Sequence, residues 1–148
     1  MPADVTTARD DIYTTFHVKW DADTPAVNGG AVPEVFRDGI GEPTDKPTTA
    51  AWARIQIRHA AGAQDGFGTG EIRTTKSGLV TVQIFQPLST SPDTTLAEDL
   101  AKIAKSAYEG EVTANCVRFR DVTINEVGPT DAWYQINVVA TFEYTEFA

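Results

Sequence analysis

The chain has 148 residues, 41% of them hydrophobic and 22% charged, which is typical of one folded domain of ordinary size. A net charge of −9, from 21 acidic and 12 basic residues, argues against tight binding to nucleic acid, because such binding needs Lys and Arg beside the phosphates. The single cysteine, Cys116, excludes an intrachain disulfide. No apolar run approaches the ~20 residues of a membrane-spanning helix, and no signal-peptide pattern is visible. We therefore expect a cytoplasmic protein without a membrane partner.

An amphipathic helix is predicted for residues 5–20, with an apolar stripe that should pack on a sheet. The stripe consists of Val5, Ala8, Ile12, Phe16 and Trp20, at spacings of three and four. Thr6 or Thr7 could cap this helix. Residues 21–50 hold four prolines and four glycines, which predicts an irregular loop with at most a short strand near residues 32–36.

Alternating apolar and polar residues predict a strand over residues 51–60, and β-branched residues predict a second strand over residues 79–86. The segment between them, residues 61–78, is rich in glycine and polar residues and has few large apolar side chains. We interpret this segment as the extended tip of a hairpin. Phe67 is its one large aromatic residue, and we expect it to contact a neighbouring subunit because it is costly to leave in water.

A second helix is predicted for residues 96–108, with Thr95 and Glu98 as a capping box and Gly110 just after the end. Two strands follow, over residues 117–127 and 133–146, with a turn at residues 128–131. The order of elements predicts an α+β fold over residues 1–148 as a single domain. It has an antiparallel or mixed sheet of about four to five strands, two helices packed on one face, and a long hairpin loop.

No residue pattern indicates catalysis or a cofactor. His17 and His59 lie on a helix and at a strand end, outside any hydrolase-like motif, and the neighbours of Cys116 suggest no activating base. Structural roles are favoured for all three. Glu126 and Glu143 could meet as paired carboxylates, although carboxylates on sheets usually face solvent.

Two segments imitate binding loops without completing the motif. The glycine-rich residues 66–70 lack the helix and the Lys-Ser/Thr pair of a phosphate loop. Asp21 and Asp23 begin like a calcium loop, but Pro25 and Ala26 interrupt the pattern, so a turn is the simpler interpretation. No Cys/His cluster has zinc spacing, and we expect neither metal nor cofactor.

Basic residues are concentrated on the predicted strands and beside the hairpin. Strand alternation should place Arg54 with Arg58 on one face, and Arg118 with Arg120 on one face. A nucleic-acid patch is one interpretation. A subunit interface is favoured, in which arginines meet the excess acid of a neighbouring copy. The candidate interface residues are Phe67, Arg73, Lys76, Arg54, Arg58, Arg118 and Arg120.

Three segments in the second half of the chain share a strand-like pattern. They read GLVTVQIFQPL at residues 78–88, VRFRDVTINEVG at residues 117–128 and WYQINVVATFEY at residues 133–144. These segments resemble the tail terminator proteins of long-tailed, siphovirus-like bacteriophages, and ARDDIY at residues 8–13 and WARIQIR at residues 52–58 are also similar. The resemblance covers most of the chain except residues 21–50, and it rests on structural strand patterns.

The resemblance implies a structural virion protein that forms a homohexameric ring at the head-proximal end of a tail. Such a ring ends growth of the tail tube and provides the docking surface for the head or neck connector. Its partners would be copies of itself, the tail tube protein and the connector, with DNA passing through the lumen without tight binding. Assembly would occur in the host cytoplasm.

Two alternative functions remain open from the sequence. A tail tube or head–neck connector subunit would share the small α/β architecture, but tube subunits tend to form open stacks whereas a terminator closes as one ring. A small acidic ligand-binding module or enzyme would require a deep pocket with convergent titratable groups.

Overall fold

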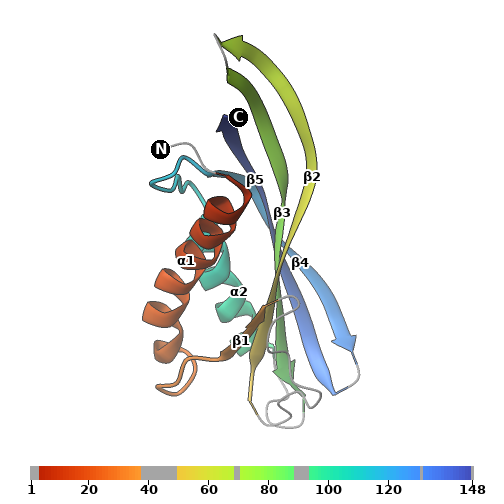
Figure 1. Cartoon of the computed structure of the whole chain (residues 1–148). Coiled ribbons are helices and arrows are strands. Elements are labelled where there is room, and N and C mark those ends of the chain that lie inside the picture. The colour runs from red at the N-terminus through yellow and green to blue at the C-terminus, as the bar shows by residue number, and fades with distance from the viewer. Residues whose placement is uncertain (1–3, 38–49, 69–70, 89–93, 131, 148) are drawn as a thin grey trace.

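The computed structural model describes residues 4–37, 50–68, 71–88, 94–130 and 132–147. Two helices cover one face of a five-stranded mixed sheet, and the sheet curves past both ends of the helical layer (Figure 1). This architecture confirms the predicted α+β fold. No helix in the described part of the chain has the length and apolar character needed to cross a bilayer.

Both helices lie close to their predicted ranges, but each begins with a different cap from the one expected. α1 spans Val5–Asp23, and its cap is Asp4, whose carboxylate accepts a 2.7 Å hydrogen bond from the main-chain N–H of Thr7. The expectation of Thr6 or Thr7 was wrong because the helix begins at Val5, so both threonines already lie inside its first turn. α2 spans Thr95–Tyr108, and its cap residue is Thr94, whose hydroxyl donates to Glu98 at 3.0 Å. The expected Thr95 already lies inside the helix.

The sheet has the strand order β1-β2-β3-β5-β4, in which β1 runs parallel to β2 and all other neighbours are antiparallel. The strands are β1 Glu34–Arg37, β2 Trp52–Gly68, β3 Glu71–Pro87, β4 Arg118–Thr130 and β5 Trp133–Phe147. β1 confirms the short strand expected inside the 21–50 loop, and a 3-10 turn, Thr24–Ala26, follows α1. Residues 38–49 of that loop lie outside the described residues.

The hairpin differs from the sequence prediction because its strands are longer than expected. Residues 61–78 were interpreted as a tip, but β2 and β3 remain paired from Ala61↔Ser77 to Gly68↔Glu71. One register shift lies just before this segment, between His59 and Ala61, and another lies inside it, between Gln64 and Gly66. Glycine retains the main-chain donor and acceptor that a ladder needs, so its low strand propensity did not end the strands. The far part of this hairpin extends beyond the helices (Figure 1).

The turn expected at residues 128–131 is also shorter than predicted. β4 continues to Thr130 and β5 begins at Trp133. Gly128 has a positive φ of 96° next to a register shift in β4, so its conformational freedom serves a bulge in the strand rather than the turn.

The core lies between the helices and the facing side of the sheet. α1 contributes its predicted stripe, with Ile12, Phe16 and Trp20 fully buried, while Val5 at the start of the stripe is exposed. Trp20 also donates through its indole N–H to the carbonyl of Pro33 at 3.2 Å, which ties α1 to the start of β1.

Candidate functional site

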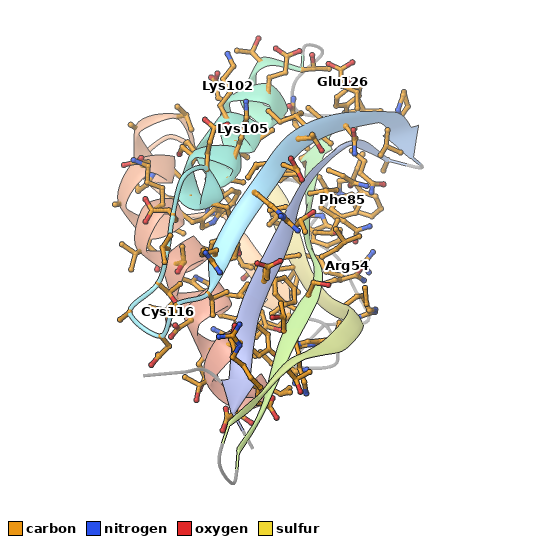
Figure 2. The ribbon with its side chains drawn as sticks, turned by 90° about the horizontal axis from the view of Figure 1, so that it is seen from above. Arg54, Phe85, Lys102, Lys105, Cys116 and Glu126 are labelled. Carbon is orange, nitrogen blue, oxygen red and sulfur yellow. The ribbon has the colours of Figure 1, made fainter. Side chains whose placement is uncertain are left out.

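Strand alternation gives the sheet two chemically different faces. One face packs on the helices through apolar side chains such as Ile55, Val82 and Val138. We call the other face the open face. Its principal described side chains are Trp52, Arg54, Arg58, Leu79, Gln83, Phe85, Asn137, Thr141, Glu143, Arg118 and Arg120. Figure 2 shows Arg54 and Phe85 on this face, across the sheet from α2 with its labelled Lys102 and Lys105.

Arg118 and Arg120 of β4 share one carboxylate on β5. Their guanidinium groups lie 3.7 Å and 3.3 Å from the Glu143 carboxylate, and their side chains are 64% and 61% exposed. The expected common face of this pair is therefore observed. Two cations beside one anion leave an excess of one positive charge at this edge of the open face. Exposed ion pairs of this kind add little to stability.

Arg54 and Arg58 also lie on the open face, but in different surroundings. Arg54 donates from Nε to the side-chain oxygen of Gln83 at 2.7 Å, and its guanidinium lies 6.0 Å from the centroid of the Phe85 ring. Trp52 stacks on Phe85 with a centroid distance of 4.1 Å. Arg58 is exposed and lies level with Leu79.

The hairpin residues Arg73 and Lys76 do not share a face. Their spacing of three residues along β3 places them on opposite sides of the sheet. Lys76 forms a 3.1 Å ion pair with Glu146 of β5, whereas Arg73 is exposed. The side chain of Phe67 lies outside the described residues, so its expected contact stays a prediction.

His59 is an exposed residue whose ring contacts two aromatic side chains of β5. Its Nε2 lies 3.0 Å from the Tyr144 hydroxyl, and its ring meets the Phe142 ring edge-on at 5.3 Å. Burial is the main cause that lowers the pKa of His59 below its ordinary value, with smaller contributions from the charges of Arg9 and Lys76. His17 lies 3.7 Å from Asp21, one turn further along α1.

Cys116 belongs to a tight turn that is attached to α1. It is exposed and has a positive φ of 64°, and its main-chain N–H donates to Thr113 at 2.9 Å. The carboxylate of Asp11 accepts hydrogen bonds from Thr113 and Asn115 and so fixes this turn against the helix. These hydrogen bonds account for the conformation of the turn without any role for a reactive Cys116 thiol.

The remaining candidates for chemistry are separated or explained by the fold. Glu126 lies level with Ile136 and Glu143 lies level with Arg118, so the two carboxylates do not meet. Asp21 and Asp23 belong to the last turn of α1, which corrects the expected turn, and Asp23 pairs with Lys19 at 3.0 Å. Among the described residues, no three His, Cys, Asp or Glu side chains form a cluster that could hold a metal.

Two shallow hollows in the helical layer are lined by residues that the structure describes. One, of about 550 Å³, lies between α1 and β1 and includes His17 and Arg37. The other, of about 310 Å³, lies between α1 and the end of α2 and includes Thr14 and Glu111. Val18 borders both hollows and is 68% exposed.

Comparison with known proteins supports the fold and carries no functional description. No protein-family model matches the chain. No curated protein sequence matches it significantly. Among solved structures, 26 chains match. One of these, whose name describes no activity, aligns with a TM-score of 0.62 and 15% identity over 92% of this chain and 94% of the matched chain. At this identity the likeness shows the α+β fold alone.

Proposed function

We propose that the chain is a structural virion subunit that assembles as a ring at the head-proximal end of a phage tail. In this role it ends growth of the tail tube and provides the surface on which the head or neck connector docks. The proposal combines the resemblance of the strand segments to tail terminator proteins with the form of the β2–β3 hairpin. It requires no catalytic residue and no cofactor.

The observation that carries the proposal is the position of the hairpin relative to the core. The buried core cluster includes Ile57 of β2 and Val80 of β3, but none of the described residues between them. The strands nevertheless stay paired as far as Gly68↔Glu71, well past the helices. β5 stays paired with β3 as far as Arg73, so only the last pairs of the hairpin, Phe67↔Ile72 and Gly68↔Glu71, form a ribbon of two strands. Two strands alone are marginally stable in water, so contact with a neighbouring molecule would stabilise this end of the hairpin.

Contact between the hairpin and a neighbouring subunit can be tested by mutating Phe67. Burying one phenylalanine side chain against a neighbour contributes roughly 1.5–3 kcal/mol per contact, and a closed ring repeats that contribution at every interface. Phe67→Ala should therefore leave the melting temperature of the isolated subunit nearly unchanged while it weakens ring formation. Both quantities are measured on the same sample, by thermal unfolding and by sedimentation velocity.

A matched control is Val127→Ala, which removes an apolar side chain that is 50% exposed on β4. This variant should assemble like the wild type. A Phe67→Ala subunit that loses stability but assembles normally would show that Phe67 folds back on its own sheet, and it would remove this support for the proposal. Growth into open stacks instead of a closed ring would favour a tail tube subunit.

A further inference from the structure

The two layers of the molecule carry opposite charge. The helical layer, taken as residues 4–24 and 94–112, has nine acidic and four basic side chains. Among the side chains that the structure describes, Arg73 and Glu34 also lie on the open face. The face therefore has five arginines and two carboxylates, with the exposed Asp121 in the β4 bulge beside Arg120. A chain with a net charge of −9 has thus concentrated arginines on one side of its sheet. Faces of opposite sign steer association between molecules and fix its orientation.

The open face combines this charge with an exposed apolar centre. Leu79 is 44% exposed, and strand pairing places it in one row with Arg58 on one side and with Thr141 and Arg120 on the other. An apolar side chain between cationic ones is suited to a surface with the opposite charge and a matching hollow.

Such a surface lies on the helical layer. Asp10, Thr14, Val18 and Asp21 follow one another along the outer side of α1 at helical spacing. Val18 and Thr14 border the 310 Å³ hollow together with Glu111 and with Lys19, whose ammonium group pairs with Asp23. We call this region, consisting of Asp10, Thr14, Val18, Asp21 and Glu111, the acidic groove.

The strand edges are less suited to joining copies. β4 is an edge strand with two register shifts, a positive φ of 53° at Asp121 and Pro129 near its end. Bulges, prolines and charges on an edge strand oppose pairing with another chain. The outer half of β2 also contains two register shifts.

We propose that the open face of one copy docks on the acidic groove of the next, with Arg118 and Arg120 opposite Asp10 and Glu111. Because the contact joins two different surfaces, each copy can bind one neighbour through its open face and another through its acidic groove. Repetition of such a contact closes into a ring when the rotation permits. The inference rests on the proposed function, because it names the surfaces by which the ring is built.

Charge reversal on each surface tests the contact. Arg118→Glu/Arg120→Glu and Asp10→Lys/Glu111→Lys should each weaken self-association roughly tenfold or more, because each brings like charges together. An equimolar mixture of the two variants should recover wild-type association, since every interface then joins opposite charges again. Glu126→Lys is the control, because Glu126 is exposed on β4 outside both surfaces, and it should associate like the wild type (Figure 2).

Sedimentation velocity over a range of concentrations gives the association of each sample, and circular dichroism verifies that each variant is folded. If the wild type assembles and both reversed variants assemble equally well, the docking surfaces are wrong while the ring proposal stands. If the mixture recovers a dimer or an open chain but no closed ring forms, the surfaces are right and the ring proposal fails. A wild type that stays monomeric at every concentration, both alone and with tail tube protein, overturns both. If both charge-reversed variants associate like the wild type but Thr123→Pro does not associate, the contact between copies lies at the β4 edge.

Discussion

Gly78 allows a sharp test of the packing at the base of the hairpin. An added Cβ at this position would lie 2.2 Å from the main-chain oxygen of Arg58, 2.7 Å from the ring of Phe142 and 3.0 Å from the Cα of His59. The nearest atom is main chain, which cannot rotate away, so β2 and β3 must separate to accept a methyl group. Overpacking of this kind costs about 2–3 kcal/mol. Gly78→Ala should therefore lower the melting temperature by roughly 4–12 °C.

The sign of the change in melting temperature distinguishes a packing clash from an effect on the entropy of the unfolded chain. Gly78 does not have a positive φ in the left-handed region, so alanine can adopt its backbone conformation. Without the clash, replacing glycine would stabilise the fold by about 0.4–1 kcal/mol, since the unfolded chain loses freedom. Ser77→Ala, on the neighbouring half-buried residue, is the control and should change stability by less than about 0.5 kcal/mol. A Gly78→Ala protein that melts at or above the wild-type temperature in a calorimeter would refute the close approach of β2, β3 and Phe142.

Two further predictions concern acid stability and DNA. The hydrogen bond from Thr7 is the main cause that lowers the pKa of Asp4 below 3.8, so the contribution of Asp4 to stability is present at neutral pH and is lost as the pH falls through the folded-state pKa. In urea unfolding, wild type and Asp4→Ala should differ at pH 7 and converge in strong acid, and a constant difference would contradict the cap. The excess of acidic groups predicts no binding to duplex DNA tighter than roughly 10⁻⁶ M at physiological salt. A tighter, salt-sensitive complex in a filter-binding titration would show that the arginines of the open face bind phosphates.

The sequence predicts elements well where one periodicity dominates. The apolar stripe of α1 and the β-branched residues of β3 each matched a single pattern, and each element includes its predicted range, although β3 begins earlier, at Glu71. The hairpin was misjudged because its glycines suggested a loop, whereas main-chain pairing holds it as strand to Gly68. The requirement for glycine at 78 comes from Phe142, which is remote in sequence, so no local pattern indicates it.

Only part of the candidate site could be predicted from the sequence. Alternation alone places Arg118 and Arg120 on one face, but the carboxylate that they share belongs to β5 and depends on strand register. Register also separates Glu126 from Glu143, a pair that the sequence left open. The opposite charges of the two layers depend on which strand residues face away from the helices, and the sequence alone does not show this.

The mass of the purified wild-type protein in solution tests the central claim most directly. Native mass spectrometry from low to high micromolar concentration, alone and with tail tube protein, distinguishes a closed ring from its alternatives. Self-assembly into a ring predicts one discrete species, a hexamer of 16.0 kDa chains, whose size does not grow as the concentration rises. A monomer at every concentration, both alone and with tube protein, or a distribution that lengthens without limit, would contradict it.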